Sequence, residues 1–433
     1  MIKKALENLQ IAKLNAMQQA SIKAAANHDV VLLSPTGSGK TLAFLLPVLS
    51  SLNHEVQNVQ ALILVPSREL ALQIEQVFRT MSTGFKITCC YGGHATKIEK
   101  NSLLQPPAVL VGTPGRIAYH LREGNFETMY IHTLVLDEFD KALEFGFQTD
   151  MAAIIGSIPN IRKRILTSAT QMDDIPEFTG VDHPAVVNFL EDNVNTPDIR
   201  LKVVISPAAD KLDTLFALIC KISGKPTLVF CNHREAVDRI SDLLWYRGIV
   251  HDVFHGGMEQ EDRERALLKF RNGSHNLLIT TDLASRGLDI PDIEYVVHYQ
   301  LPHNREAFIH RNGRTARMHA KGTAYLVMGE DEKMKYLTEE PEFEILPKRL
   351  KLPPLADWVT LYIGAGKKDK INKVDIVGLL LQKGKLAKDE LGRIEVMDHS
   401  SYAAIKRDRI EKVVQLIRGE KIKNKKVKIE ISQ

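Results

Sequence analysis

Ser34-Pro35-Thr36-Gly37-Ser38-Gly39-Lys40-Thr41 lies between an apolar run, residues 30–33, and a helix-like run, residues 42–52. In a strand-to-helix turn of this kind, backbone N–H groups and the helix N-terminus can bind a phosphate chain. Lys40 would reach the β- and γ-phosphates, and the Thr41 hydroxyl would hold Mg²⁺. The full pattern begins with glycine, where Ser34 stands here, and glycine-rich strand ends also occur in folds that bind no nucleotide. The context still predicts a nucleotide site.

A second apolar run, residues 134–136, ends in Asp137-Glu138-Phe139-Asp140. One carboxylate at such a strand end can bind Mg²⁺, directly or through water, while a second orients the attacking water. We assign these roles to Asp137 and Glu138. An acidic pair at a strand end is also common as a solvated terminus, but its combination with the phosphate loop favours an ATPase site in which Lys40 is catalytic as well.

Composition restricts the class of protein. The chain has 433 residues, 44% apolar and 25% charged, so it can form about three domains of ordinary globular composition. Its apolar run at residues 42–52 is too short to span a membrane, and no stretch near the N-terminus resembles a signal peptide. Cys89, Cys90, Cys220 and Cys231 lack metal-ligand spacing. We therefore expect a cytoplasmic protein with reduced thiols and no membrane partner.

Short β-rich runs alternate with helical runs along most of the chain. The strands predicted in the first part are residues 30–33, 61–65, 86–91, 108–112, 132–136, 164–168 and 185–189. Those predicted in the second part are residues 201–206, 226–231, 250–254, 276–280, 294–299 and 323–328. Nearly continuous apolar strands separated by helices are typical of a parallel sheet covered on both faces. The pattern predicts the α/β class, with two tandem doubly wound domains.

Polar and proline-containing segments divide the chain. The predicted parts are a first domain at residues 1–190, a linker at 191–200, a second domain at 201–347, a linker at 348–357 and a third domain at 358–433. The third reads as strand, helix, strand, strand, helix and strand, with the last strand at residues 425–431, and this is the order of small RNA-binding modules. Residues 361–433 hold 18 Lys and Arg against 10 Asp and Glu, whereas the whole chain carries only +4. This concentration favours a nucleic-acid partner over a solvated surface.

Several further motifs occur in a fixed order around the two site motifs. They are Pro66-Ser67-Arg68-Glu69-Leu70-Ala71, Gly92-Gly93, Thr113-Pro114-Gly115-Arg116, Ser168-Ala169-Thr170, Thr280-Thr281-Asp282-Leu283-Ala284-Ser285-Arg286-Gly287-Leu288-Asp289 and His310-Arg311-Asn312-Gly313-Arg314-Thr315-Ala316-Arg317. In this order the sequence resembles the DEAD-box ATP-dependent RNA helicases, with Asp137-Glu138-Phe139-Asp140 in place of the motif that names the family. The resemblance implies two RecA-like domains.

The same resemblance assigns roles in ATP hydrolysis. Gln18 would read adenine, and Asp289 would contact the ribose. Arg314 and Arg317 would stabilise the transition-state charge on the γ-phosphate. Asp140, Ser168, Thr170 and His310 would couple hydrolysis to RNA binding. Outside this context, each would pass for a surface or capping residue.

The resemblance also implies RNA contacts that read the backbone and the 2′-hydroxyl, so that RNA is preferred over DNA without regard to base sequence. In the first domain these contacts are Pro66, Ser67, Arg68, Gly93, Thr113, Pro114, Gly115 and Arg116. In the second they are Asn232, His255, Gly256, Gln260, Arg263 and Thr280.

Three positions depart from the family pattern. Met1 stands where an aromatic residue normally precedes the adenine-reading glutamine, so adenine selectivity should depend more on Gln18. Ala316 replaces a glycine between the two arginines. Phe139 replaces a small alanine and must find room beside the strand. None of these changes removes a reactive group, and Phe139 is the one that bears most on turnover.

The last domain resembles the C-terminal RNA-binding domain of the DbpA type of bacterial DEAD-box protein. The likeness rests on residues 361–370, 391–396 and 421–426. Only Tyr362 and Tyr402 stand near base-stacking positions, so binding should depend on lysines that grip phosphates of a folded RNA. Those lysines are Lys367, Lys368, Lys370, Lys423, Lys425 and Lys426. The resemblance implies a hairpin of 23S-type rRNA as substrate and a role in large-subunit (50S) assembly, against the alternative of a basic domain without a particular RNA.

Two other functions remain open at this point. The first is an RNA clamp that binds ATP but hydrolyses it too slowly to cycle, which Phe139 would explain. The second is a translocating DNA helicase, which the RNA-type third domain disfavours. The sequence shows no dimer surface, so we expect a monomer.

Overall fold

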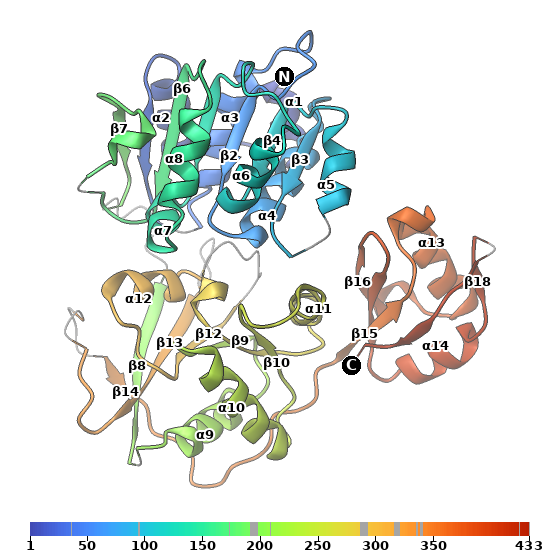
Figure 1. Ribbon diagram of the computed structural model, residues 1–433. Helices are drawn as coiled ribbons and strands as arrows, with labels where there is room; N and C mark the ends of the chain where they lie inside the picture. Colours follow the sequence, from blue (N-terminus) through green and yellow to red (C-terminus); the bar gives the residue numbers. More distant parts are fainter. Residues whose placement is uncertain are drawn as a thin grey trace. The chain divides into compact units, whose positions relative to one another are not determined.

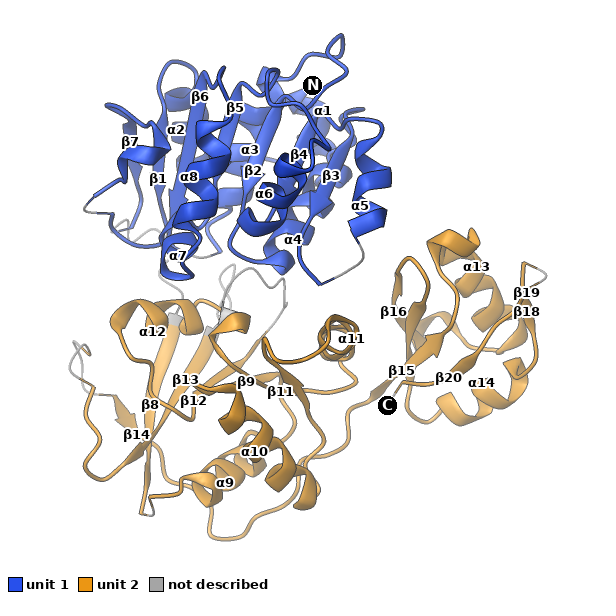
Figure 2. Cartoon of the chain, viewed as in Figure 1, with its two compact units in different colours: residues 1–196, 286–289 blue, residues 197–285, 290–433 orange. Residues whose placement is uncertain are grey.

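The computed structural model describes residues 1–35, 37–93, 96–172, 174–190, 198–207, 209–285, 293–315, 321–334, 337, 341–423 and 425–432. They form two compact units, one within residues 1–190 and the other within residues 198–432 (Figure 2). Thr36, Asp289 and Arg317 of the expected ATP site lie outside the described residues, as do residues 191–197 of the expected linker.

The first unit is built on a parallel sheet of seven strands in the order β3-β4-β2-β5-β6-β1-β7 (Figure 1). These strands are β1 (Val30–Leu33), β2 (Ala61–Leu64), β3 (Ile87–Cys90), β4 (Val109–Gly112), β5 (Thr133–Leu136), β6 (Lys163–Ser168) and β7 (Ala185–Asn188). Its helices are α1 (Ile2–Asn8), α2 (Ala16–Ala25), α3 (Lys40–Ser51), α4 (Arg68–Thr80), α5 (Thr96–Leu103), α6 (Pro114–Arg122), α7 (Phe139–Glu144) and α8 (Gln148–Gly156).

Successive side chains of each strand enter different cores, as expected for a sheet buried on both faces. Val30 and Leu32 of β1 pack in one core with α3 and α4. Val31 and Leu33 pack in the opposite core with α6 and α8. The predicted doubly wound fold is confirmed for this unit.

Phe139, which the sequence left without an obvious place, lies in the second of these cores. Its side chain is fully buried, and its ring centroid is 6.2 Å from that of Phe178. The residue begins α7 but contributes to the packing of the sheet. The ring therefore takes an apolar place, where its size stabilises the domain.

The second unit contains another parallel seven-stranded sheet, in the order β10-β11-β9-β12-β13-β8-β14. Its strands are β8 (Asp198–Ser206), β9 (Thr227–Phe230), β10 (Asp252–Phe254), β11 (Leu277–Thr280), β12 (Tyr295–His298), β13 (Lys321–Gly329) and β14 (Glu342–Phe343). Its helices are α9 (Leu212–Ile222), α10 (Arg234–Tyr246), α11 (Gln260–Arg271) and α12 (Arg305–Asn312). β8 begins three residues before the predicted linker ends, because Asp198 to Arg200 pair with the start of β13.

The C-terminal part of the second unit has a four-stranded antiparallel sheet in the order β16-β17-β15-β20 (Figure 1). Its elements are β15 (Trp358–Ile363), α13 (Lys373–Gly378), the π-helical turn η6 (Leu379–Lys383), β16 (Leu391–Val396), β17 (Ser401–Lys406), α14 (Ile410–Ile417), β18 (Lys421–Ile422), β19 (Lys425–Lys426) and β20 (Ile429–Ile431). The prediction of one strand over residues 425–431 is wrong. Residues 425–426 pair with β18 in a separate hairpin, and only residues 429–431 join the sheet.

Among the described helices, none is both long enough and apolar enough to cross a membrane.

We expect Phe139→Ala to lower the free energy of unfolding of the first domain by about 3–5 kcal/mol, because it leaves a cavity in a packed core. Hydrogen exchange of the β5 and β6 amides at increasing denaturant would measure the loss. Phe145→Ala is the matched control, because that phenylalanine is 51% exposed. Equal protection in the two variants would contradict the packing role.

Candidate ATP site and RNA interface

Both sets of predicted residues in the first unit lie at one edge of its sheet. All seven strands run parallel, so every loop that follows a strand leaves at the carboxyl edge. The phosphate loop, the acidic motif and Ser168 follow β1, β5 and β6, which are neighbours in the sheet. Pro66, Gly92 and Thr113 follow β2, β3 and β4, which are also neighbours. The strand order thus separates the residues predicted to bind ATP, which we call the ATP half of the sheet, from those predicted to bind RNA, which we call the RNA half.

The phosphate loop is closed by its own polar groups. Lys40, which is buried, donates from Nζ to the backbone oxygen of Ser34 at 2.8 Å. The hydroxyls of Ser34 and Ser38 are 3.0 Å apart, so serine at the first position of the motif is used inside the loop. Gly37 and Gly39 have φ of 83° and 89°, a conformation that other residues seldom adopt. Thr41 follows in the first turn of α3.

Gln18 contacts the phosphate loop from α2. Its Nε2 donates to the backbone oxygen of Gly39 at 3.3 Å, and a Cβ at Gly39 would lie 2.7 Å from the same nitrogen. Asn15 caps α2 and donates from Nδ2 to the backbone oxygen of Ser38 at 3.0 Å. The structure therefore brings the predicted adenine-reading residue to the loop, together with Asn15, which the sequence analysis did not select.

The acidic pair is held by a threonine that the sequence analysis also missed. Thr167, at the penultimate position of β6, donates its hydroxyl to Oδ1 of Asp137. The backbone N–H of Glu138 donates to Oδ1 of Asp137 at 3.1 Å and to Oγ1 of Thr167 at 3.2 Å. Glu138 adopts φ 48° and ψ 49°, a conformation that costs a non-glycine residue of the order of 1 kcal/mol and is typical of functional sites. The hydrogen bond to Thr167 stabilises this backbone conformation of Glu138.

The Asp137 carboxylate suits a divalent cation. It is only 3% exposed, and its burial raises its pKa even though the Thr167 hydroxyl and the Lys40 ammonium act in the opposite direction. Both donors among the described residues use Oδ1. A buried carboxylate whose charged form is disfavoured gains most from a cation ligand, since the ion restores the lost solvation.

The residues predicted to couple hydrolysis to RNA binding contact one another in the first unit. Thr170 donates its hydroxyl to Oδ2 of Asp140 at 3.0 Å. Ser168 bonds to Thr170 twice, donating to its backbone oxygen at 2.7 Å and accepting from its backbone N–H at 3.0 Å. The backbone oxygen of Ser168 also accepts from the N–H of Ser34 at 3.1 Å, which connects this group to the phosphate loop.

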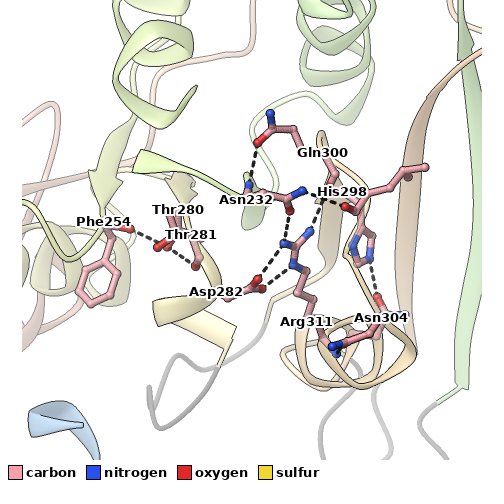
Figure 3. Close-up of polar contacts among 12 residues, drawn as sticks. Asn232, Phe254, Thr280, Thr281, Asp282, His298, Gln300, Asn304 and Arg311 are labelled. Carbon is pink, nitrogen blue, oxygen red and sulfur yellow. Dashed lines mark hydrogen bonds and ion pairs between the residues drawn. The ribbon is translucent and has the colours of Figure 1, made fainter. Parts of the chain in front are cut away.

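In the second unit, Arg311 connects three strand ends (Figure 3). Its buried guanidinium donates to both carboxylate oxygens of Asp282, at 2.6 and 3.0 Å. It also donates to the backbone oxygen of Gln300 and to Oδ1 of Asn232, each at 2.8 Å. Asn232 uses its Nδ2 on the backbone oxygen of Leu301, so its carboxamide serves this network. Arg311 belongs to the motif at residues 310–317, but no role of its own was expected for it.

Two further predicted residues of the second unit lie close to Arg311 in the sequence, one before it and one after it. His310 lies in α12 and Arg314 just after it, and both side chains are buried. His310 lies 3.7 Å from a carboxylate oxygen of Glu306, one turn earlier.

The predicted RNA contacts of the first unit form a connected set. Arg68 donates from Nη1 to the backbone oxygen of Gly92 at 2.8 Å and lies 4.6 Å from the centroid of the Tyr91 ring. Ser67 caps α4, and Thr113, Pro114 and Gly115 begin α6. Both helix N-termini point backbone N–H groups toward this edge, which suits phosphate oxygens.

The predicted RNA contacts of the second unit lie after β9 and β10, in α11 and at the end of β11, at the equivalent half of its sheet. His255 is buried and lies 2.9 Å from a carboxylate oxygen of Asp238, whereas Gly256 is exposed. Gln260 accepts from Nη2 of Arg263 at 2.7 Å on α11. The Thr280 hydroxyl donates to the backbone oxygen of Phe254 at 2.6 Å, so it serves the strand edge (Figure 3).

The C-terminal lysines gather around one hairpin. Lys423 donates to the backbone oxygen of Lys370 and pairs with Asp375 at 2.8 Å. Lys425 pairs with Asp369 at 3.0 Å, and Lys368 lies 3.7 Å from Asp398. These contacts bring residues 367–370, 421–423 and 425–428 to one surface, which we call the lysine hairpin surface. Lys367, Lys370 and Lys426 on it are exposed.

The outer face of the C-terminal sheet is covered at Thr360 and at Tyr402. Thr360 is 1% exposed and lies 2.7 Å, between hydroxyl oxygens, from Ser274 of the α11–β11 turn. Tyr402 is 8% exposed, and its ring lies 5.5 Å from that of Tyr362, its partner across the strands. The expectation of little base stacking agrees with this burial.

Comparisons with known proteins agree with this architecture. Residues 15–178 match the family described as DEAD/DEAH box helicase, and residues 210–319 match the one described as Helicase conserved C-terminal domain. These matches make the protein a helicase with two core domains. The chain is similar to the solved structure of S. cerevisiae Dbp5 bound to RNA and ADP BeF3, with 28% identity and a TM-score of 0.68. The match covers 76% of this chain and 86% of that chain. Mss116p bound to ssRNA and AMP-PNP gives 27% identity and the same TM-score, over 80% of this chain and 77% of that one.

The third domain identifies the type of helicase within this family. Residues 360–431 match the DbpA RNA binding domain. The ATP-dependent RNA helicases DbpA of Bacillus subtilis and Escherichia coli are each 31% identical to this chain, over 99% and 98% of it and 96% of their own length. The chain therefore belongs to the DbpA type of DEAD-box ATP-dependent RNA helicases.

We expect Thr167→Val to lower kcat for ATP about tenfold or more, as is usual when a residue that orients a site carboxylate is lost. The KM for ATP should change little, because the phosphate loop is intact. Steady-state ATPase measurements at saturating RNA would show this, with Glu138→Gln as the reference in which turnover is lost but ATP still binds. Thr167→Ser keeps the hydroxyl and should retain most activity, while full kcat in the valine variant would exclude the positioning role.

We also expect the second domain to lose stability in acid through His298. Burial, with the nearby Arg311, lowers the pKa of His298 to about 3, so the folded state holds this histidine neutral while the unfolded chain binds a proton below pH 6.5. Between pH 6.5 and 3 this proton binding lowers the free energy of unfolding, by about 2–3 kcal/mol at pH 4.5 relative to neutral pH. Both tryptophans, Trp245 and Trp358, lie in the second unit, so denaturation followed by their fluorescence reports on it. His298→Gln should make the free energy of unfolding depend less on pH. An unchanged dependence in this variant would disprove the role of His298.

Proposed function

We propose that this helicase remodels structured RNA of the large ribosomal subunit during its assembly. The observation that carries the proposal is the lysine hairpin surface on a domain of the DbpA RNA-binding family. Lysines that are far apart in sequence meet there, and the sheet face that would stack single-stranded bases is covered. Such a surface favours recognition of a folded RNA through its phosphates and shape. The substrate itself, a hairpin of 23S-type rRNA, follows from the family resemblance.

In the ATP site, the proposed roles follow from placement. Gln18 and the loop residues from Gly37 to Thr41 would bind ATP, with Thr36 and Asp289 as further proposed contacts. Asp137 and Thr41 would hold Mg²⁺, which when bound neutralises charge on the phosphates. Glu138, fixed by its backbone contact to Thr167, would orient the attacking water. Arg314 and Arg317 of the second domain would stabilise the charge that develops on the γ-phosphate.

In the RNA halves of the two sheets, the proposed contacts are backbone N–H groups, hydroxyls and cations aimed at successive phosphates. This mode gives little base specificity, so the third domain would supply the choice of RNA. The burial of Phe139 in the core removes the feature that motivated a slow RNA clamp. A monomer located in the cytoplasm remains our expectation.

The proposal predicts that RNA-stimulated ATPase prefers a large-subunit rRNA hairpin fragment. With the full chain, we expect the KM for that fragment to be at least about tenfold lower than for poly-uridine RNA, and DNA to stimulate weakly, because the lysine hairpin surface adds phosphate contacts that only a folded RNA satisfies. Equal stimulation by both RNAs would indicate a general RNA helicase. Stronger stimulation by DNA would restore the DNA-helicase alternative.

A matched pair of variants tests the surface itself. Replacing Lys367, Lys370 and Lys426 by Gln should raise the KM for the hairpin fragment by about tenfold and leave poly-uridine stimulation nearly unchanged. The control replaces Lys383, Lys388 and Lys412, exposed lysines of the same domain outside the hairpin, and removes the same charge. Equal effects of the two triple variants would show that only net charge matters.

A further inference from the structure

One buried carboxylate connects all three RNA segments of the first domain. Glu99, on α5, is 2% exposed, although glutamate is seldom buried without a partner. Its Oε1 accepts from the backbone N–H of Tyr91 at 2.8 Å. Its Oε2 lies 3.0 Å from Nη1 of Arg116 and 2.7 Å from Nε2 of His120. The donors that converge on it compensate the cost of burying its charge.

These donors come from the segments that the RNA proposal uses. Tyr91 directly precedes Gly92 and Gly93, and Arg116 closes the first turn of α6. Arg68 reaches the same place from α4, through the Gly92 backbone oxygen and the Tyr91 ring. Glu99 thus holds together the segments that follow β3 and β4, and Arg68 joins the segment that follows β2 to them.

His120 completes the support of the carboxylate. The side chain is fully buried, and its Nδ1 lies 2.9 Å from Nδ2 of Asn125. Because an amide nitrogen can only donate, Nδ1 accepts and Nε2 carries the proton that is donated to Glu99. The imidazole therefore fixes Oε2 at the position where it meets Arg116.

The same cluster is not suited to a metal ion. The ligand atoms of Cys90, Glu99 and His120 lie within 4.8 Å of one another, which is close enough for coordination. The Arg116 guanidinium occupies Oε2, however, and repels a cation. Burial also raises the pKa of the Cys90 thiol, so the thiolate ligand is disfavoured. A positional role for Glu99 accounts for these contacts.

We propose that Glu99 is a positioning residue for RNA binding, which orients Arg116 and the Gly92–Gly93 turn toward the RNA backbone. The inference rests on the proposed RNA role of Arg116. A guanidinium has five N–H donors, so a bond through Nη1 fixes its direction and still allows it to contact a phosphate. The side chain of Arg116 is 13% exposed, which keeps it in contact with solvent.

The test measures binding of the full chain, with a non-hydrolysable ATP analogue, to a fluorescent poly-uridine RNA at several salt concentrations. For Glu99→Gln we expect the Kd for RNA to rise about tenfold and the slope of log K against log salt to fall by about 0.7, the share of one phosphate contact on single-stranded RNA. The KM for ATP and kcat at saturating RNA should stay within about twofold. A Kd and slope equal to those of the native chain would overturn the proposal, as would an equal loss of ATP affinity.

Two further variants separate position from stability. Glu123→Gln is the control, because Glu123 also links α5 to the end of α6, through Lys100 at 2.8 Å, but is exposed; it should leave the Kd and slope unchanged. In an Arg116→Gln background, Glu99→Gln should have little additional effect, because the two act as a unit. Additive effects, or native RNA affinity in Arg116→Gln alone, would refute the inference. Failure of the native chain to respond to RNA would instead refute the proposed function.

Discussion

Parallel strand pairing is the constraint on which both core domains depend. In a parallel sheet the chain leaves every strand at the same edge, so loops from distant parts of the sequence meet there. The order of strands then decides which loops are neighbours. In the first sheet, β1, β6 and β5 place the phosphate loop beside the acidic motif, while β2, β4 and β3 place the RNA segments together. In the second sheet, β9, β11 and β10 repeat the RNA half. The separation of the residues proposed to bind ATP from those proposed to bind RNA therefore follows from the topology of the sheet before it depends on individual side chains.

The end of β6 shows how the ATP half is held as one piece. Three consecutive features of this strand act on three neighbours: Thr167 bonds to the acidic pair, the backbone oxygen of Ser168 bonds to the phosphate loop, and its hydroxyl bonds to Thr170. Thr170 in turn reaches Asp140. Because Thr167, Ser168 and the acidic pair are buried, breaking one of their bonds leaves another group unpaired at a cost of about 1–3 kcal/mol. A change of position at the acidic motif is therefore transmitted to the residues that follow β6, and not absorbed by solvent.

The sequence predicts what is encoded locally and misses what depends on distant contacts. Apolar runs of four to six residues identified the strands of both parallel sheets except β14, because burial on both faces leaves a continuous pattern, whereas both residues of β14 are exposed. The prediction of one strand over the lysine-rich residues 425–431 failed, since alternation alone does not distinguish one strand from a hairpin followed by a strand. Among site residues, those in glycine-rich or acidic motifs were found. Glu99 and Thr167 were not, because each stands in an ordinary polar context, and its partners lie up to 30 residues away in the chain.

The structure of the third domain bears on which part of the protein selects the RNA. An RNA-recognition fold normally offers its sheet face, and here that face is covered at Thr360 and at Tyr402. The positive charge lies instead on the lysine hairpin surface, where Asp369 and Asp375 hold two of the lysines in fixed positions. Cations held in place discriminate between RNA shapes better than mobile ones, because a restrained side chain cannot move to contact a phosphate in a different position. If the helicase core reads only the RNA backbone, as we propose, the selectivity of the whole protein resides in the geometry of this hairpin, and the covered position Thr360 contacts Ser274 of the second core domain instead of RNA.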